Sequence, residues 1–366
     1  SQASSPGEGT SNSSSGREQP VGNSKDGIVD IFAAGDNILH QAVIDSAETG
    51  DGSYDFTKYY QYIARDIENA DIAVINQESP LGGETLGIGG YPNFNSPQEI
   101  GDNLVSLGFD VITQANNHMM DKGAKGVTET LKYWKKHPDT TVVGINESEA
   151  DRSRTRIVER NGVKVAFLAY TYGLNGYKLP AGQEYLVNLI DRDAIKEDVE
   201  RAQAEADAVV VSMHWGVEYS TTTSSTQHSL AQYLADLGVN LVIGHHPHVI
   251  QRVSRVKGKN GNETLVFYSL GNFLSSQERS PRMLGAVANV RLEKKDGAVT
   301  ITQAKITPTV THFEKGKKDF KIYKLSEYTD ELAARHGIHE FDSPFSIGSL
   351  TSLAKNVLKD WYSEDK

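Results

Sequence analysis

The sequence contains no cysteine, which excludes disulfide bonds, iron–sulfur clusters and metal sites built on thiolates. Any metal ion bound by this chain must therefore be held by His, Asp, Glu or Asn side chains. Positive charge is also scarce, because 37 Lys and Arg stand against 48 Asp and Glu and the net charge is −11. A field of this sign repels nucleic acid and anionic membrane surfaces. We therefore expect no nucleic-acid partner, and an anionic substrate would need a local cation.

Long apolar runs are absent as well, since no stretch of about 18 apolar residues predicts a transmembrane span. The 366 residues, 38% of them hydrophobic, are enough to bury a large core. We expect a disordered tether over 1–26, where Ser, Gly, Asn and Pro dominate, then a main domain over 27–312. A C-terminal extension over 313–366 is expected to pack on that domain. Because the first residue of this tether is not Met, we also expect an upstream signal peptide or lipid anchor.

Strand and helix patterns alternate from residue 28 onward, which predicts an α/β fold. Five apolar runs have the length of buried strands, and each leads to polar residues: 28–34, 71–77, 110–115, 207–213 and 241–244. Helical spacing is found at 37–47, 54–69, 97–108, 125–136, 191–206, 226–237 and 348–361. Later strands are predicted at 249–257, 264–270, 285–294 and 298–307. A glycine-rich loop over 81–97 is too long for a simple connector, and such loops are often functional.

The stretch LVIGHHPHV, residues 241–249, changes from an apolar run into glycine and three histidines. Because Gly and Pro end the strand sharply, the imidazoles are expected at the carboxyl edge of a sheet, where open α/β sheets bind ligands. The other runs lead to Asp36, Glu78, Asn117 with His118, and His214. Carboxylates, an amide oxygen and imidazoles are the ligands expected for one or two ions of Mn, Fe or Zn. Two such ions would clamp a phosphoryl oxygen and activate a water molecule.

These strand ends resemble the calcineurin-like metallophosphoesterase superfamily. The strings GDNILH, NQESP, QANNHMMDKG, MHWGVEY, GHHPHVIQ and YSLGNF resemble its CapA or PgsA branch, the poly-gamma-glutamate capsule biosynthesis proteins. The resemblance covers about residues 28–275 and implies a four-layer α/β/β/α sandwich with mixed sheets. It also implies that Asp36 and His248 bind a first ion and that Glu78 bridges the two ions. Asn117, His214 and His246 would complete the ligand set of the second ion. His118 would be the acid or the transition-state stabiliser.

The first motif departs from the superfamily pattern, because Asp36-Asn37-Ile38 stands where the superfamily has Asp-x-His. His40 lies one helical turn beyond Asp36 and would be the substitute ligand, although most such histidines are incidental. Glu78 also stands where the superfamily has a bridging Asp, and its longer arm would shift the bridge. The first ion site is therefore expected to be the weaker of the two.

Four further residues have both a functional and a structural interpretation. Asn272 either reaches the site from the next strand or caps a turn. Glu218, four residues after His214, either orients that imidazole or is surface charge. Arg279 and Arg282 either grip a phosphate or carboxylate of the substrate or are simply solvated. The remaining histidines are given structural roles: His137, His228 and His312, with His245 the weakest ligand of its cluster.

The leading hypothesis is a surface-tethered metallophosphatase-like hydrolase that acts in the synthesis or anchoring of a capsule or cell-envelope polymer. Its substrate would be an anionic polymer, a phosphoester or an amide, and membrane-bound capsule-synthesis proteins would be its partners. The resemblance implies a location at the extracellular face of a bacterial membrane. The alternative is a non-catalytic subunit that binds polymer with a degenerate metal site. The missing first-motif histidine favours the subunit, whereas the intact Asn117-His118 pair favours the enzyme.

Overall fold

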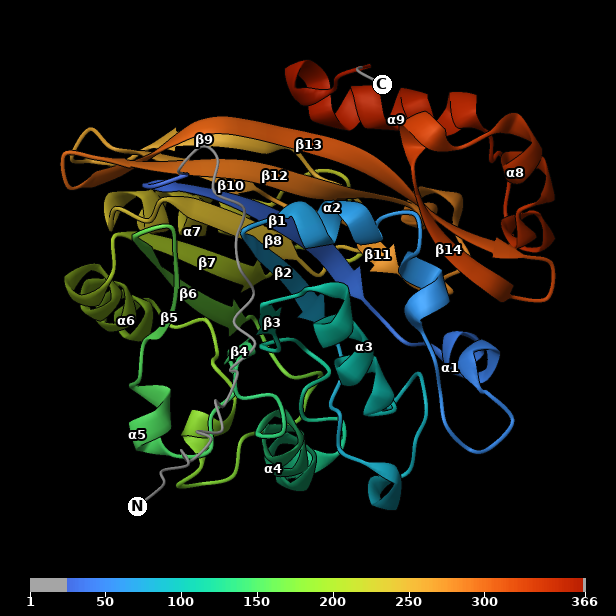
Figure 1. The fold of residues 1–366 in the computed structure, drawn as a ribbon, viewed down its shortest axis with the longest axis horizontal. Coiled ribbons are helices and arrows are strands. Elements are labelled where there is room, and N and C mark those ends of the chain that lie inside the picture. The colour runs from blue at the N-terminus through green and yellow to red at the C-terminus, as the bar shows by residue number, and fades with distance from the viewer. Residues whose placement is uncertain (1–24, 365–366) are drawn as a thin grey trace, which may run out of the picture.

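Two mixed β-sheets form the centre of the computed structural model, which describes residues 25–364 (Figure 1). The first sheet has the order β14-β13-β12-β1-β2-β3-β4, with β11 paired to β1. Its strands are β1 (Ile28–Asn37), β2 (Ile72–Gln77), β3 (Val111–Thr113), β4 (Thr141–Val143), β11 (Asn272–Leu274), β12 (Leu284–Lys295), β13 (Ala298–Glu314) and β14 (Lys318–Lys324). The strands β1 to β4 are parallel, whereas β12 to β14 are antiparallel.

The second sheet has the order β5-β6-β7-β8-β10-β9. Its strands are β5 (Arg156–Arg160), β6 (Val163–Thr171), β7 (Ala208–His214), β8 (Leu241–His245), β9 (Val253–Lys257) and β10 (Glu263–Phe267). The four central strands of this sheet are parallel, and both edge strands are antiparallel. The prediction of mixed sheets is confirmed.

Helices cover the outer faces of both sheets. They are α1 (Gln41–Ala47), α2 (Ala64–Asn69), α3 (Glu99–Leu107), α4 (Gly123–Trp134), α5 (Glu149–Arg152), α6 (Arg192–Glu205), α7 (Ser225–Asp236), α8 (Asp330–Arg335) and α9 (Ile347–Leu358). Short 3-10 turns occur at Thr57–Tyr60, Glu84–Leu86, Glu184–Leu186, Ser280–Met283, Leu325–Glu327, Gly337–Glu340 and Lys359–Trp361. Figure 1 shows α9 lying over β13. Within residues 25–364, no helix has both the length and the apolar character needed to cross a bilayer.

The strand β7 shows why the central runs are apolar throughout. Successive side chains of a strand point to opposite faces. Ala208 and Val210 therefore join the large core that also holds side chains of the first sheet. Val209 and Val211 join a second cluster beneath α6 and α7. The second sheet is buried on both faces, as expected of the central strands of a four-layer sandwich.

Several predicted boundaries differ from the structure, among them the start of the helix predicted over 54–69, which begins only at Ala64, and the ends of β1 and β13. The strand β1 continues to Asn37, because Asp36 and Asn37 pair with β2 and β11 across a register shift, so the following helix starts only at Gln41. The strand β13 runs to Glu314 and pairs with β14. The division placed after residue 312 thus falls within β13, and residues 313–314 and 318–324 are strand residues of the first sheet. The predicted tether over 1–26 lies almost entirely outside the described residues.

The glycine at position 244 allows β8 to approach the chain that follows β10. A Cβ atom there would overlap the Tyr268 carbonyl oxygen and lie 2.7 Å from Nε1 of Trp215. Trp215 donates its indole N–H to that same carbonyl at 2.8 Å. This position therefore has no room for a side chain, and it directly precedes the three clustered histidines.

We expect Gly244→Ala to lower the free energy of unfolding by at least about 1–3 kcal/mol, the usual cost of an overpacked core. Urea unfolding followed by circular dichroism measures this difference. Gly173→Ala is the matched control, because nothing lies within 4 Å of a Cβ at that position. Equal unfolding midpoints for the two variants would contradict this prediction, because they would show that the Tyr268 backbone can shift without lowering the free energy of unfolding.

Candidate metal centre

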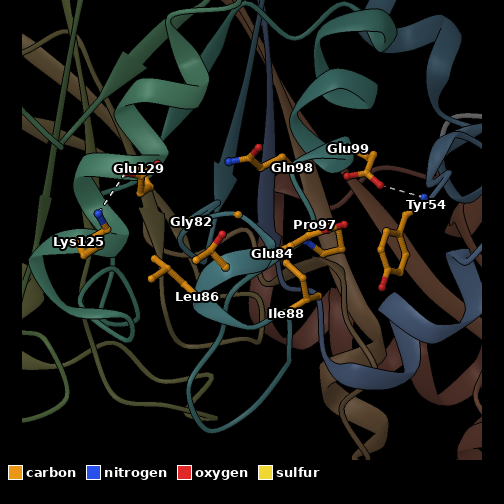
Figure 2. Close-up of a pocket in the computed structure, with 12 residues that line it drawn as sticks. Tyr54, Gly82, Glu84, Leu86, Ile88, Pro97, Gln98, Glu99, Lys125 and Glu129 are labelled. Carbon is orange, nitrogen blue, oxygen red and sulfur yellow. Dashed lines mark hydrogen bonds and ion pairs between the residues drawn. The ribbon is translucent and has the colours of Figure 1, made fainter. Parts of the chain in front are cut away.

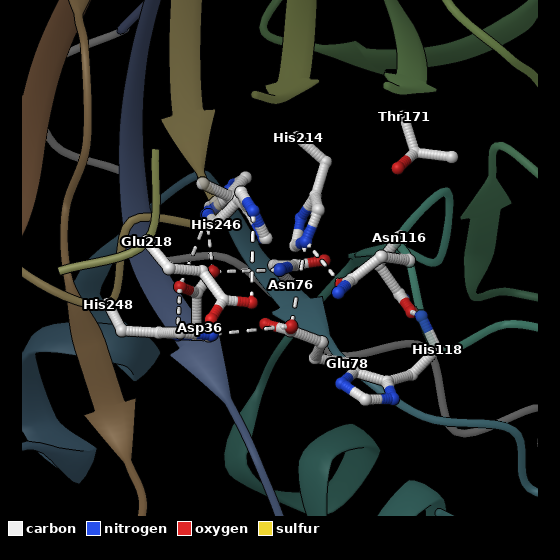
Figure 3. Close-up of polar contacts among 12 residues, drawn as sticks. Asp36, Asn76, Glu78, Asn116, His118, Thr171, His214, Glu218, His246 and His248 are labelled. Atoms are coloured by element: carbon white, nitrogen blue, oxygen red, sulfur yellow. Dashed lines mark hydrogen bonds and ion pairs between the residues drawn. The ribbon is translucent and has the colours of Figure 1, made fainter. Parts of the chain in front are cut away.

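The carboxyl ends of β1, β2, β3, β7 and β8 meet and bring together the polar side chains that follow them (Figure 3). Within the part of the chain that the structure describes, three overlapping groups of side chains could hold a metal ion. They are Glu78, His214 and His246; Asp36, Glu78 and His248; and Glu218, His246 and His248. In each group the ligand atoms lie within 4.8 Å of one another. The chain folds these residues together although they are far apart in sequence.

Asp36 is fully buried and contacts polar groups of both sheets. Its Oδ1 accepts a hydrogen bond from Asn76 Nδ2 at 2.9 Å and lies 3.2 Å from His245 Nδ1. Its Oδ2 lies 3.1 Å from His248 Nδ1. Although burial opposes ionisation, contacts from His245 and His248 hold the pKa of Asp36 well below its usual value. The side chain is therefore a fixed negative charge at neutral pH.

Glu78 provides the strongest indication that the centre is built for a cation. The side chain is fully buried, and neither carboxylate oxygen has a hydrogen-bond partner among the described residues. Its Oε1 lies 3.5 Å from Nε2 of His214 and 3.7 Å from Nε2 of His248. Burial raises the pKa of Glu78 to about 8. Buried carboxylates are costly unless paired or metal-bound, so this donor set fits a divalent transition ion.

His214 and His246 form the other side of the centre. Nε2 of His214 lies 2.9 Å from Oδ1 of Asn117 and close to Glu78. Burial lowers the pKa of His214 well below its usual value, and burial together with His214 lowers that of His246 to about 2. Neutral imidazole is the form that ligates metals. Asn117, His214, His246 and Glu78 are thus grouped as the resemblance implied.

The turn that carries His246 and His248 has an unusual backbone. The φ angles of these residues are +102° and +61°, values that side-chain-bearing residues rarely adopt. Such strain is typically retained at functional sites because the surrounding structure fixes it. Nδ1 of His248 lies 3.0 Å from Oδ1 of Asn272, in addition to its contact with Asp36. These two oxygens orient the ring so that Nε2 faces Glu78. Asn272 therefore contacts a residue of the centre, which corresponds to the first of its two interpretations.

His118 stands beside the centre and belongs to none of the three ligand groups. Its Nδ1 makes a 2.7 Å hydrogen bond with Oδ2 of Asp121, which also accepts the Phe94 N–H at 2.9 Å. The ring of Phe94 packs edge-on against the His118 ring, with centroids 4.6 Å apart. A histidine oriented by a carboxylate on one nitrogen presents the other nitrogen for proton transfer.

A cleft of about 410 Å³ opens over this centre and includes Asn117, His118 and His248 in its walls. Residues 91–94 of the glycine-rich loop form one wall, together with Asn175 and Tyr177. None of the described residues that line the cleft is Lys or Arg. An anionic substrate group entering the cleft would therefore find its positive charge at the metal centre.

The same glycine-rich loop borders a second cleft of about 470 Å³, shown in Figure 2. Residues 82–88 line it together with Tyr54 and Glu99. Asn95 is buried and fixes the loop, because it accepts the Gly82 N–H at 2.7 Å and donates to the carbonyls of Gly83 and Gly87 at 3.0 Å. The long loop is thus an ordered connection between two clefts.

Four residues singled out from the sequence lie around the centre in other ways. Nδ1 of His40 accepts the Ser276 N–H at 3.3 Å, and His40 is in none of the three ligand groups. Arg279 lies 4.0 Å from Asp342, and the Arg282 guanidinium stacks on the Tyr219 ring, 3.3 Å from its centroid. Neither arginine lines the cleft. Glu218 lies nearest to His246, at 3.9 Å from Nε2.

Sequence reasoning missed three residues that position side chains of the centre and its cleft: Asp121, Asn76 and Asn175. It considered His245 only as the weakest ligand of its cluster, and the structure places Nδ1 of His245 3.2 Å from Asp36 Oδ1. Asp121 follows His118 by three residues within the string QANNHMMDKG, and that spacing was the signal that could have identified it. Asn175 accepts a hydrogen bond from Asn117 Nδ2 at 3.0 Å, and it lies 58 positions away in sequence. Only the folded chain shows that contact.

Comparisons with known proteins identify related sequences. Residues 30–277 match the family described as "Bacterial capsule synthesis protein PGA_cap". The "Capsule biosynthesis protein CapA" of Bacillus anthracis is 36% identical over 174 residues, 46% of this chain and 41% of that protein. The "PGA biosynthesis protein CapA" of Bacillus subtilis (strain 168) is 33% identical over 201 residues, 52% of this chain and 49% of that protein. Each match thus spans less than half of the relative's length.

A solved structure shares the fold. The putative 5'-nucleotidase from Staphylococcus aureus superposes with a TM-score of 0.50 and 16% sequence identity, over 76% of this chain and 54% of that chain. The likeness concerns the fold alone, and it confirms the expected metallophosphatase-like sandwich.

Proposed function

Because this chain belongs to the PGA_cap family of bacterial capsule synthesis proteins, we propose that it is a metal-dependent hydrolase of the phosphoesterase type, acting in the synthesis or anchoring of a capsule or cell-envelope polymer. The observation that carries this proposal is the buried Glu78 carboxylate, which has no hydrogen-bond partner within residues 25–364 and lies between the imidazoles of His214 and His248. A buried carboxylate is costly unless it is paired or metal-bound, and Asn117 and His248 of the same centre line the open cleft.

The ligand groups define where the metal would be held. Asp36, Glu78 and His248 form one set, and Glu78, His214, His246 and Asn117 form the other. When bound by these residues, a divalent ion would supply positive charge for a phosphoryl oxygen and would lower the pKa of a water nucleophile. Mn, Fe and Zn suit this mixture of carboxylate, amide and imidazole ligands.

The remaining residues of the cleft handle protons and orientation. Asp121 holds Nδ1 of His118, so the other ring nitrogen is directed away from this carboxylate and is available to the substrate. In this role His118 donates a proton to the oxygen that leaves. Asn175 steadies the amide of Asn117, which keeps its Oδ1 directed at His214. The packing of Phe94 against His118 keeps water from one side of the ring.

We also propose that the protein acts at the extracellular face of a bacterial membrane, next to membrane-bound capsule-synthesis proteins. The Ser-, Gly- and Asn-rich composition of residues 1–26 supports a tether, and the family supports the partners. An anionic polymer, a phosphoester or an amide is the proposed substrate. The cleft walls suit such a substrate only when the metal centre supplies the charge.

A second candidate function is a non-catalytic subunit that binds polymer. The observation that favours it is Ile38, an apolar residue at the position where the superfamily has a first-motif histidine. Its side chain is buried and offers no ligand atom. A centre that lacks one ligand would still hold an anionic chain through the remaining positive charge.

Hydrolysis assays separate these two functions. We expect the purified chain, supplied with Mn²⁺, Fe²⁺ or Zn²⁺, to hydrolyse p-nitrophenyl phosphate or its diester, and to lose this activity with a chelator. Glu78→Gln keeps the shape of the side chain and removes its charge, so both metal binding and turnover should fall by at least about 10- to 100-fold. Absence of hydrolysis on every substrate, with polyglutamate binding undiminished, would establish the binding subunit instead.

A further inference from the structure

The Asp36 side of the centre is short of ligands. Asp36, Glu78 and His248 supply three donors there, and Ile38 supplies none. The Ile38 N–H is already used, because it donates to the Leu274 carbonyl at 2.9 Å. Transition ions in protein sites take at least four ligands, counting water or substrate. A further side chain near His248 would complete the set.

Glu218 is the carboxylate that approaches His248 of this set, together with His246 of the other set. Its Oε1 lies 3.9 Å from Nε2 of His246, and one of the three ligand groups consists of Glu218, His246 and His248. The two histidine side chains are at most 5% exposed, whereas that of Glu218 is 41% exposed. Figure 3 shows Glu218 beside the two histidines. It thus reaches the cluster from the solvent side, where the buried residues leave the centre open.

The loop that carries Glu218 is fastened to the histidine turn. The Tyr219 N–H donates to the Pro247 carbonyl at 2.7 Å, between the two histidines in sequence. Tyr219 has a φ of +67°, and Gly216, two residues before Glu218, has a φ of +84°. A Cβ at Gly216 would lie 2.9 Å from the side chain of Gln227. The position of Glu218 relative to His246 and His248 is therefore set by backbone contacts.

His40 is the competing candidate for the missing donor. Its Nδ1 accepts the Ser276 N–H, and its ring packs edge-on against Phe94, with centroids 5.4 Å apart. These contacts hold the imidazole in place without a metal. No ligand group of the described residues includes it.

We propose that Glu218 is a metal ligand, which supplies from the loop after β7 the donor that Ile38 cannot supply from the first motif. The inference rests on the metal centre of the proposed function and concerns binding, so it can be tested without any turnover. A Glu218 ligand would provide a carboxylate oxygen in place of the imidazole nitrogen of the superfamily's first motif. An oxygen ligand favours harder ions such as Mn²⁺ over softer ones.

Titration of metal-depleted protein with Mn²⁺, by calorimetry and electron paramagnetic resonance, tests the proposal. The unmodified chain is expected to bind two ions that give a spin-coupled spectrum. Glu218→Gln should weaken one of them by at least about 10-fold and leave the spectrum of a single ion. Glu84→Gln, in the second cleft, is the matched control and should bind both ions unchanged.

His40→Ala completes the comparison and should also retain both ions. Thermal unfolding checks that each variant is folded, and Glu218 is exposed enough for the Gln variant to fold normally. Equal titrations for Glu218→Gln and the unmodified chain, or loss of an ion only in His40→Ala, would overturn the proposal. So would an unmodified chain that binds one ion or none. Two ions bound without any hydrolysis would overturn the proposed function and leave Glu218 as a ligand.

Discussion

A His118→Gln variant is expected to retain its fold and its metal while its turnover falls by about 10²- to 10⁴-fold, the usual contribution of a general acid. The imidazole lies outside the ligand groups, and its Nδ1 is held by Asp121 at 2.7 Å. Glutamine keeps the size and some of the hydrogen bonding but cannot transfer a proton near neutral pH. The comparison requires kcat for phosphate esters together with metal analysis of the same samples.

The leaving group provides the sharper measurement. A good leaving group, such as p-nitrophenolate, needs little protonation, so the loss should be smaller for it than for an alkyl alcohol. Asp121→Asn tests the positioning role, because it should lower kcat and change the pH profile while His118 is still present. If good and poor leaving groups suffer equally in His118→Gln, the histidine does not act as an acid.

The second large effect is expected when a ligand is removed from the better-formed metal site, the set of Glu78, His214, His246 and Asn117. Loss of a hydrogen bond to a metal ligand typically lowers metal affinity by about 10- to 100-fold. We expect a larger decrease for His246→Ala or Asn117→Ala, because each removes a ligand itself. Elemental analysis after dialysis measures the metal that remains. His246 lies in one ligand group with His214 and Glu78, and Oδ1 of Asn117 lies 2.9 Å from Nε2 of His214, so each change removes a donor from this set.

His137→Ala is the control for these two variants. Its ring bonds to Tyr133 and Asp102, away from the centre, so metal content should not change. If metal content is the same in His246→Ala, Asn117→Ala and the unmodified chain, the assignment of this centre fails.

The ligand cluster could be predicted from the sequence for a physical reason. A buried parallel strand is an unbroken apolar run, and the carboxyl ends of neighbouring strands meet at one edge. Asp36, Glu78, His214 and His248 could therefore be grouped without any knowledge of the connections between strands. Local pattern indicates which polar residues lie at or soon after the end of each strand, although it does not fix the last residue of the strand.

The positions of the residues around this cluster could not be predicted in the same way. Whether Glu218 faces His214 or His246 depends on the Tyr219 N–H bond to Pro247, a contact between two loops. The site of His40 depends on where β1 ends, and the register shift that extends β1 to Asn37 has no sequence signal. The length of β13 depends on its pairing with β14. The alternation of apolar and polar residues within β13 alone does not reveal that pairing.

The centre draws its ligands from both sheets. Asp36 lies near the end of β1 and Glu78 follows β2 in one sheet, whereas His214 ends β7 and His248 follows β8 in the other. An ion held by all four is then a cross-link between the two halves of the sandwich. Any ligand that binds only the folded state adds RT ln(1 + [L]/Kd) to stability, about 2.7 kcal/mol at a free concentration 100 times Kd. Metal supply would thus affect how tightly the two sheets stay docked, and removal of the metal would lower the stability of the sandwich.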